Sequence, residues 1–416
     1  MPLTQSNVAP AFRKTTETFR AGAKSLAQRY FVSPEIFAQE QRKIFSEQWI
    51  LIGHQSQIPK AGDYFVAEVG GVTKESLIVV RDQKSEIRAF YNVCRHRGTR
   101  LKENACGHAS TIQCPYHAWT YALDGRLVGA PQMDDVPGFD KADYSLHRVN
   151  LDVWEGFIFV NLADGGTRLR SEATARQAPG DFISLERWFA PLNGKFADWN
   201  MSILRTARRI EYDVRANWKL MFENYSECYH CPGVHPMLSK VSPYDSAEND
   251  LAEGPFLGGF MKINPGKSLS MSGNACALPI EHDHPPSPGY GAAGEQKHEK
   301  ESTHRVFYYT IFPNMLLSLH PEYVMVHQLW PQSPERTLII CDWLFHPEAF
   351  KRKDFNPQDA IEFWDMTNKQ DWHVCELSQQ GIASRAYEPG PYSSRERIPA
   401  AWDRYYLRSM EREARS

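Results

Sequence analysis

Two short segments each place a cysteine close to a histidine. Cys94 and His96 have one residue between them, Cys114 and His117 have two, and 17 residues separate the pairs. Two thiolates and two neutral imidazoles can bind either a zinc ion or a two-iron, two-sulfur cluster in which the cysteines bind one iron and the histidines the other. Zinc ribbons usually use two Cys-x2-Cys pairs, whereas each pair here runs from cysteine to histidine. The pattern therefore favours the mixed cluster, with structural zinc as the alternative.

A second pair of histidines, His230 and His235, lies in the stretch NWKLMFENYSECYHCPGVHP. On an unbroken helix these side chains would point ~140° apart, which suits a single metal poorly. Because Pro232 and Gly233 interrupt a helix, we expect His230 to end a helix and His235 to return on the following turn. Two imidazoles and one carboxylate on one face of the metal form the site of non-heme Fe(II) oxygenases. Taken alone, the spacing is more typical of two surface histidines.

A carboxylate for such a site must come from another part of the chain. The predicted helix over 357–380 carries four candidate acids, Glu362, Asp365, Asp371 and Glu376. One of its faces contains Trp364, Asn368, Asp371 and Cys375, at helical spacing. An acid on such a weakly polar stripe needs a partner, and a metal is a suitable one. The pattern favours Asp371, with Asp365 next, and a solvated helix charge remains the alternative.

The first motif resembles a known family. CRHRG(x)15CPYHAWTY is similar to the Rieske iron–sulfur motif of the ring-hydroxylating oxygenase α subunits, and it differs from respiratory Rieske proteins, whose additional cysteines are replaced here by Thr99 and Tyr116. That family also carries the motif around His230 and His235. The stretch from Gln370 to Gly381 resembles the family's C-terminal segment, in which the aspartate binds the iron. The resemblance therefore implies a [2Fe–2S] cluster and a mononuclear Fe(II), with Asp371 as the third iron ligand.

The same resemblance implies a role for Glu227. In the family, an acid at this place links the mononuclear iron to a Rieske histidine of the neighbouring subunit, which implies a homotrimer. Many ring dioxygenases have aspartate there, and the segment ENYSECYHCPGVHP is closer to the branch that oxidises choline, glycine betaine, proline betaine and carnitine. We expect Glu227 to lie on the same helical face as His230. The alternative is an ordinary surface charge.

The implied function is that of an oxygenase component that activates O2 at Fe(II) and hydroxylates or N-demethylates a small quaternary ammonium compound. Electrons would come from NAD(P)H through a separate ferredoxin-type reductase, since this chain has no glycine-rich dinucleotide fingerprint. An aromatic-ring (di)oxygenase acting on an aromatic acid is the first alternative, and a pure electron-transfer protein is the second. Aromatic side chains suit a cation, although they are equally typical of a core; the candidates are Phe256, Phe260, Tyr308, Tyr309, Phe312, Trp343 and Phe345.

The remaining patterns predict an α+β chain with two domains. Residues 34–48 form an amphipathic helix in an N-terminal segment (1–46) that packs on the catalytic domain. Short strand-like runs separated by turns predict a small antiparallel β domain over 47–165. A catalytic domain over 166–416 contains helices at 181–189, 218–230 and 357–380, a loop-like stretch over 240–302, and strands at 304–312, 322–331 and 336–345. The resemblance makes this domain a helix-flanked antiparallel sheet.

Composition excludes several other classes of protein. The 416 residues contain 47 basic and 50 acidic side chains, so nothing supports nucleic-acid binding. No apolar run is long enough to cross a membrane, and the N-terminus has no secretory signal, so we expect a cytoplasmic protein. Eight cysteines are too few for a disulfide scaffold. Six of them have no assigned role, and packing is the expectation for most: Cys106, Cys228, Cys231, Cys276, Cys341 and Cys375.

Overall fold

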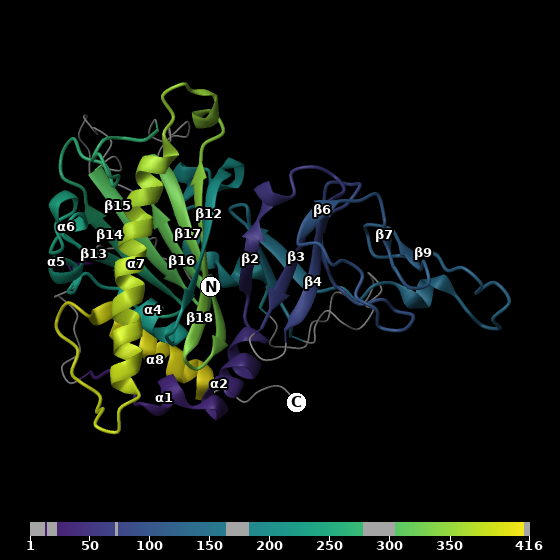
Figure 1. Ribbon diagram of the computed structural model, residues 1–416, viewed down its shortest axis with the longest axis horizontal. Helices are drawn as coiled ribbons and strands as arrows, with labels where there is room; N and C mark the ends of the chain where they lie inside the picture. Colours follow the sequence, from purple (N-terminus) through teal and green to yellow (C-terminus); the bar gives the residue numbers. More distant parts are fainter. Residues whose placement is uncertain (1–12, 15–22, 71–73, 164–182, 278–303, 412–416) are drawn as a thin grey trace, which may run out of the picture. The chain divides into compact units, whose positions relative to one another are not determined.

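The computed structural model describes residues 13–14, 23–70, 74–163, 183–277 and 304–411 (Figure 1). The chain divides into two compact units. Residues 41–191 form one, which we call the inserted unit, and residues 1–40 with 192–416 form the other, which we call the main unit. The sequence predicts boundaries after residues 46 and 165, and the second of these lies outside the described residues.

The main unit is built on an eight-stranded antiparallel sheet (Figure 1). Its strand order is β1 (Arg13–Lys14), β13 (Glu248–Leu251), β14 (Phe256–Lys262), β15 (Arg305–Ile311), β16 (Met315–Leu319), β17 (Tyr323–Ser333), β18 (Arg336–Phe345) and β12 (Arg205–Val214). The central strands β16 and β17 are buried along almost their whole length, as expected for strands with both faces covered. Together with its helices, the sheet confirms the predicted α+β class.

Strands β13 and β14 correct the prediction of a long loop over 240–302. The glycines of Phe256–Lys262 hid a strand, because an isolated glycine pair usually signals a turn. A Cβ atom on Gly258 would lie 2.0 Å from the carbonyl oxygen of Tyr308, and one on Gly259 would lie 1.9 Å from that of Glu248. Both neighbouring strands therefore approach this backbone so closely that only glycine fits. Residues 278–303 of the predicted loop, including His282 and His284, lie outside the described residues.

Two further strands are absent from the prediction. β16 is only five residues long and follows β15 after a short turn. β12 carries many charged side chains and has largely exposed alternate positions, because it forms an edge of the sheet. Its Arg209 donates two hydrogen bonds to the buried Asp342 of β18, at 2.8 and 2.6 Å. Its second half does alternate, with Ile210, Tyr212 and Val214 between charged residues, a signal that the sequence prediction missed.

Helices cover the sheet. Figure 1 shows the long helix α7 (Pro357–Ile382) lying across it, with α4 (Trp218–Tyr225) and α8 (Arg397–Glu411) near its lower end. The predicted helix over 357–380 is confirmed, whereas α8 was not predicted. The remaining helices are short: α1 (Arg29–Val32), α2 (Pro34–Glu40), α5 (Cys231–Val234) and α6 (Leu238–Val241).

A buried ion pair joins the first helices to the centre of the main unit. Glu40, the last residue of α2, accepts a 2.6 Å hydrogen bond from Lys219 Nζ, and neither residue is exposed to solvent. The same carboxylate accepts hydrogen bonds from Trp218 Nε1 (2.9 Å) and from Tyr406 OH (2.6 Å). Burial lowers the pKa of Lys219, while Glu40 opposes that shift. The polar Glu40 that interrupts the apolar stripe of residues 34–48 is therefore part of the core.

The rest of the predicted N-terminal helix differs in form. After α2 the backbone continues as a π-helix over Gln41–Phe45, in which Ile44 and Phe45 are buried. The helix predicted at 181–189 is reduced to the single turn α3 (Leu185–Trp188), and residues 181–182 lie outside the described part of the chain.

The inserted unit contains three small antiparallel sheets, as the run of short strands predicted. The first has the order β10 (Asn150–Trp154), β11 (Phe157–Asn161) and β2 (Ile50–His54). The second has β5 (Ile87–Tyr91), β4 (Glu75–Arg81), β3 (Asp63–Val69) and β6 (Cys106–His108). The third has β7 (Ile112–Gln113), β8 (Thr120–Tyr121) and β9 (Leu127–Gly129). None of the helices in the described segments is long and apolar enough to span a membrane.

Removing one partner of the buried ion pair is expected to be costly. Glu40→Ala leaves the Lys219 ammonium buried without a counter-charge, so we expect the unfolding free energy of the main unit to fall by ~3–5 kcal/mol. The double variant Glu40→Leu/Lys219→Met should recover most of this loss, because no charge is then buried. Urea unfolding followed by circular dichroism measures both.

The matched control for this prediction is Asp213→Ala, which breaks the exposed Asp213–Arg336 pair. It should cost less than ~1 kcal/mol. Equal losses in Glu40→Ala and Asp213→Ala would show that burial does not make the Glu40–Lys219 pair special.

Candidate active site

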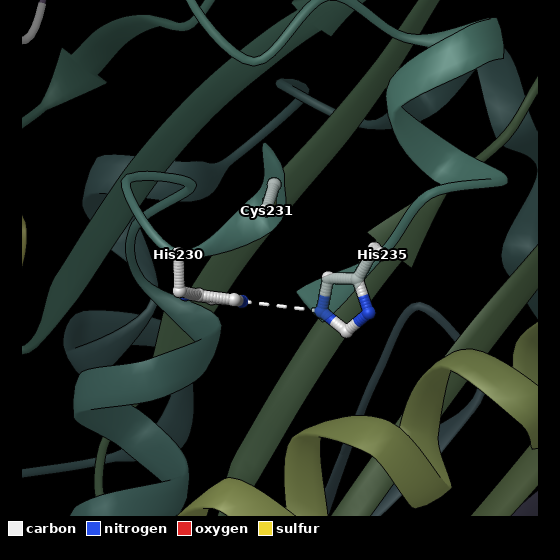
Figure 2. A group of neighbouring side chains, drawn as sticks. All are labelled: His230, Cys231 and His235. Atoms are coloured by element: carbon white, nitrogen blue, oxygen red, sulfur yellow. Dashed lines mark hydrogen bonds between the residues drawn. The ribbon is translucent and has the colours of Figure 1, made fainter. Parts of the chain in front are cut away.

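His230 and His235 lie on either side of one short helix. Helix α4 ends at Tyr225, earlier than the predicted helix over 218–230, and α5 (Cys231–Val234) follows after a turn. Pro232 stands in the first turn of α5, where its missing N–H costs no hydrogen bond, so it does not break a helix there. His230 precedes α5 and His235 ends it. The two imidazoles then face each other, with 3.2 Å between their Nε2 atoms (Figure 2).

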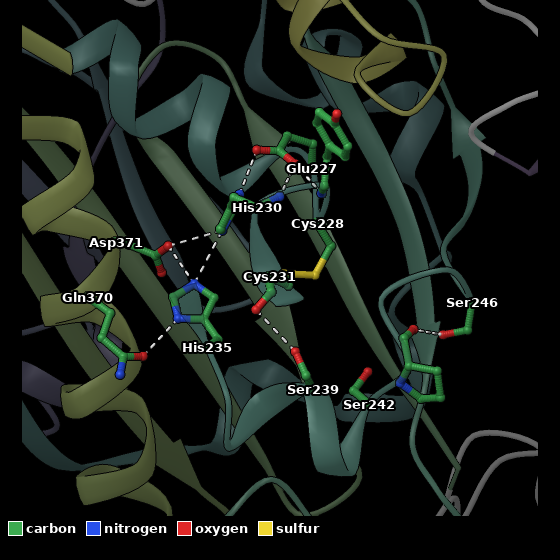
Figure 3. Close-up of a disulfide and its surroundings, with 12 residues drawn as sticks. Glu227, Cys228, His230, Cys231, His235, Ser239, Ser242, Ser246, Gln370 and Asp371 are labelled. Atoms are coloured by element: carbon green, nitrogen blue, oxygen red, sulfur yellow. Dashed lines mark hydrogen bonds and ion pairs between the residues drawn. A yellow bond between two sulfur atoms is a disulfide. The ribbon is translucent and has the colours of Figure 1, made fainter. Parts of the chain in front are cut away.

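Asp371 of α7 completes a triangle with these histidines. Its Oδ1 lies 2.8 Å from His235 Nε2 and 3.3 Å from His230 Nε2 (Figure 3). Three ligands at about 2.1 Å on one face of an octahedral metal would be ~3.0 Å apart. The three atoms therefore fit the ligand set of a two-histidine, one-carboxylate iron site. The structure brings together the three residues that the sequence favoured.

The outer nitrogens of both histidines have partners. His230 Nδ1 lies 2.5 Å from Glu227 Oε1, and His235 Nδ1 lies 2.8 Å from Gln370 Oε1. When Nδ1 carries the proton that it donates to oxygen, Nε2 is left free to bind a metal. Glu227 lies in the turn after α4, contrary to the expected helical face, and its carboxylate also accepts hydrogen bonds from the backbone of Tyr229 and His230. The sequence reasoning did not find the role of Gln370, although it is the neighbour of Asp371.

Asp371 and Glu227 also change the protonation of His230. Burial lowers the pKa of His230, but the hydrogen bonds and charges of Asp371 and Glu227 outweigh it and raise that pKa to about 10. Burial raises the pKa of Asp371, and the two histidines more than compensate, so that pKa falls below its ordinary value. Asp371 is thus ionised, and a positive charge between the three side chains is favoured.

Cys231 is an alternative to Asp371 as the third ligand. His230, Cys231 and His235 place one ligand atom each within 4.8 Å of one another. The sulfur of Cys231 is, however, bonded to Cys228 in a disulfide that encloses His230 (Figure 3). It therefore offers no thiolate, and Asp371 is the better third ligand. This disulfide is a difference from the sequence analysis, which expected packing rather than bonding for these cysteines.

The other acids of α7 have different partners. Asp365 accepts hydrogen bonds from Tyr212 OH and Lys369 Nζ, at 2.9 and 2.6 Å. Glu376 accepts one from the backbone N–H of Arg215, and Glu362 accepts one from Gln358. The first alternative for the carboxylate, Asp365, is thus engaged on another face of the helix.

The triad opens into a cavity of the main unit. Aromatic side chains make up much of its wall: Tyr225, Tyr229, Tyr244, Phe260, Tyr308, Trp364 and Trp372. The Tyr308 ring lies 5.9 Å from that of Tyr225 and 6.4 Å from that of Trp364, both edge-on. His327 also lines the cavity, and burial lowers its pKa to about 4, so it is neutral there. Of the seven aromatic candidates named from the sequence, only Phe260 and Tyr308 are among the lining residues.

The two Cys–His pairs occupy two similar loops of the inserted unit. Cys94 N donates to Thr99 O, and Cys114 N donates to Trp119 O, both at 2.8 Å. Four residues after each cysteine, Gly98 and Ala118 adopt left-handed backbone angles, with φ of 76° and 57°. The loops are thus near copies of each other, as expected for two halves of one binding site.

Their side chains are arranged with sulfur inside and nitrogen outside. Cys94 and Cys114 are each 3% exposed, whereas His96 is exposed and approaches His117 with 3.2 Å between their Nδ1 atoms. Tyr121 OH lies 3.3 Å from Cys94 Sγ, and burial raises the pKa of Tyr121, so it remains a phenol that can donate to the sulfur. These donors fit a cluster with one inner, cysteine-bound iron and one outer, histidine-bound iron.

The remaining four cysteines belong to neither proposed ligand set. Cys276, Cys341 and Cys375 are buried, which agrees with packing, and Cys106 is exposed on β6. Cys375 donates to the carbonyl of Leu220 and thereby joins α7 to α4.

Comparison with known families agrees with both sites. A model of the Rieske [2Fe-2S] domain matches residues 48–140, and a model of the ring hydroxylating alpha subunit (catalytic domain) matches residues 201–412. The chain belongs to the Rieske-type non-heme iron oxygenases and is an oxygenase α subunit. Its cofactors are therefore a [2Fe–2S] cluster and a mononuclear iron, with O2 as co-substrate and NAD(P)H acting through a reductase. The structural-zinc and electron-carrier alternatives do not account for these two domains.

Two relatives resemble nearly the whole chain. It is 32% identical to the glycine betaine monooxygenase oxygenase subunit of Chromohalobacter salexigens, over 90% of this chain and 83% of that protein. It is 29% identical to the carnitine monooxygenase oxygenase subunit of Escherichia coli K12, over 92% and 91%. A solved quaternary ammonium Rieske monooxygenase shares its fold, with a TM-score of 0.73 and 23% identity over 94% of this chain and 96% of that one.

The choice of Asp371 as a ligand predicts a clear difference between two acids of α7. Asp371→Ala should weaken binding of the non-cluster iron by more than about 100-fold, since even outer partners of metal ligands contribute about 10- to 100-fold. Competition with an Fe(II) chelator measures this affinity, and an unchanged visible spectrum shows that the cluster domain is intact.

Asp365→Ala is the matched control, because it removes an equal charge from the same helix. It should keep the iron. Retained iron in Asp371→Ala, together with lost iron in Asp365→Ala, would exchange the roles of the two residues.

Proposed function

We propose that this chain is the oxygenase component of a monooxygenase that N-demethylates a small quaternary ammonium compound such as glycine betaine. The observation that carries the proposal is the triad of His230, His235 and Asp371 at the wall of an aromatic cavity. A desolvated ammonium group binds well to aromatic faces, each worth ~0.5–2 kcal/mol. The glycine betaine and carnitine enzymes among the relatives support the same class of substrate.

We assign the mononuclear iron to His230, His235 and Asp371. The iron supplies the activation of O2 beside the bound substrate, because three protein ligands leave coordination positions open. Glu227 and Gln370 hold the two imidazoles in the tautomer that presents Nε2. The cavity wall excludes water and holds an N-methyl group near the triad. Hydroxylation of that methyl group yields a hemiaminal, which releases formaldehyde and the demethylated amine.

We assign the cluster to Cys94 and Cys114 on the inner iron and to His96 and His117 on the outer iron. Imidazoles in place of two thiolates reduce the negative charge of the cluster and raise its reduction potential. His96 is exposed and His117 is half-buried, so electrons can leave the cluster on this histidine side.

We further propose that Glu227 links the mononuclear site to the Rieske histidines of a neighbouring subunit. A quaternary ammonium Rieske monooxygenase of the same fold transfers electrons between subunits. Such a head-to-tail arrangement closes as a cyclic homotrimer. The electron donor is then a ferredoxin-type reductase, and a cytoplasmic location stays a prediction from the sequence. Light scattering tests the assembly, and a fully active monomer would contradict it.

Tyr121 provides a test of the cluster assignment. Tyr121→Phe removes the hydrogen bond to Cys94 Sγ, which stabilises the more negative, reduced cluster, so the reduction potential should fall by roughly 50 mV. A spectroscopic redox titration measures this shift. Tyr144→Phe is the control, since Tyr144 packs on Trp119 and Phe139 in the same core. Equal shifts in both variants would argue against the sulfur contact.

The function itself is tested with purified protein, a surrogate reductase and NADH. Glycine betaine should stimulate O2 consumption with one formaldehyde released per substrate consumed, and Asp371→Ala should abolish both while keeping the cluster spectrum. If the protein is instead an aromatic-ring (di)oxygenase, glycine betaine, proline betaine, choline and carnitine should not stimulate O2 consumption. An aromatic acid should then give a diol or a phenol.

A further inference from the structure

Arg395 is a charged residue of the active-site cavity that the proposed chemistry does not use. It lies in the segment that leads into α8, and its side chain lines the cavity that contains the triad. Among the lining residues within the described part of the chain, it is the one Arg or Lys. The two acids that line the cavity, Glu227 and Asp371, already hold the histidines.

The backbone that carries Arg395 is held in a defined turn. Ser393 N donates to Glu396 Oε2 at 2.7 Å, and Arg395 N donates to Ser393 Oγ at 3.3 Å. The preceding residue, Tyr392, donates from its hydroxyl to Asp403 of α8 at 2.6 Å. These bonds fix the backbone from which the Arg395 side chain extends.

Among the residues that the structure describes, the guanidinium of Arg395 has an aromatic neighbour but no anionic partner. Its Cζ lies 5.1 Å from the ring centroid of Tyr244, another residue of the cavity wall. Arg395 is half-buried, and within the described residues no carboxylate lies within 4.0 Å of its guanidinium. A partly desolvated guanidinium favours a bidentate hydrogen-bonded anion, and a carboxylate matches its planar fork.

We infer that Arg395 binds the carboxylate of the substrate and makes the cavity selective for zwitterions, in which a quaternary ammonium group and a carboxylate are joined by a short chain. The inference rests on the proposed function and narrows its substrate class. The aromatic rings contact the ammonium end, and Arg395 donates hydrogen bonds to the carboxylate end. Cations with a neutral hydroxyl instead of the carboxylate, such as choline, then lose the second contact.

Glycine betaine and choline form a matched pair for the test, because both carry a trimethylammonium group and only glycine betaine carries a carboxylate. Arg395→Gln should raise Kd and KM for glycine betaine by about 10- to 100-fold and leave those for choline within about twofold. Arg395→Lys keeps the charge but not the planar fork, so its Kd and KM for glycine betaine should lie between those of the wild type and Arg395→Gln. Calorimetry on the oxidised holoenzyme without reductase measures Kd, and formaldehyde release measures KM.

The control variant is Arg385→Gln, an exposed arginine between α7 and α8 that does not line the cavity. It should leave Kd and KM unchanged for both glycine betaine and choline. Equal weakening of both substrates by Arg395→Gln would assign Arg395 a structural role and overturn the inference, and so would unchanged binding of glycine betaine. Failure of the proposed function gives a different result, since wild-type protein would then neither bind nor demethylate any of the quaternary ammonium compounds.

Discussion

The proposed iron site depends on holding three side-chain atoms from two distant segments within 3.3 Å of one another. His235 and Asp371 are 136 residues apart, so the contact requires α7 to lie across the sheet and α5 to start immediately after the turn that follows α4. Asp371 and Glu227 place negative charge around the two imidazoles, so a positive charge among these side chains is favoured. We propose that the iron supplies that charge and that Glu227 and Gln370 present Nε2 of each histidine to it.

The cluster site was more predictable than the fold around it, because its four residues lie close together in the sequence, whereas packing depends on residues far apart. Cys94, His96, Cys114 and His117 lie within 24 residues, and their types and spacing define the cluster motif. Asp371 could be favoured from one helical face, whereas the end of α4 at Tyr225 could not be foreseen, since the residues up to His230 also suit a helix. Strand β14 was hidden by glycines whose need arises only from neighbouring strands. No local signal marked Arg395, because its place in the cavity is set by tertiary structure.

The cavity combines predicted and unpredicted parts of the chain. Tyr308 comes from the predicted strand β15, whereas Gly258 and Phe260 come from β14 and Arg395 comes from the segment before α8. The proposed iron ligands come from α7 and from the two ends of α5. A protein of this kind can therefore keep its oxygen chemistry while strands and loops exchange the residues that meet the substrate. This separation explains why the class of enzyme is readable from short motifs and the substrate is not.

The buried Glu40–Lys219 pair also affects how the protein folds during synthesis on the ribosome. Glu40 neutralises the Lys219 charge, and Tyr406 donates to the same carboxylate, so the complete network needs segments from residues 40, 219 and 406. The inserted unit, residues 41–191, is contiguous and can fold as soon as it emerges. The main unit must wait until the segment that contains Tyr406 has emerged. Nascent chains would thus acquire the electron-carrying half of the enzyme before the half that uses oxygen.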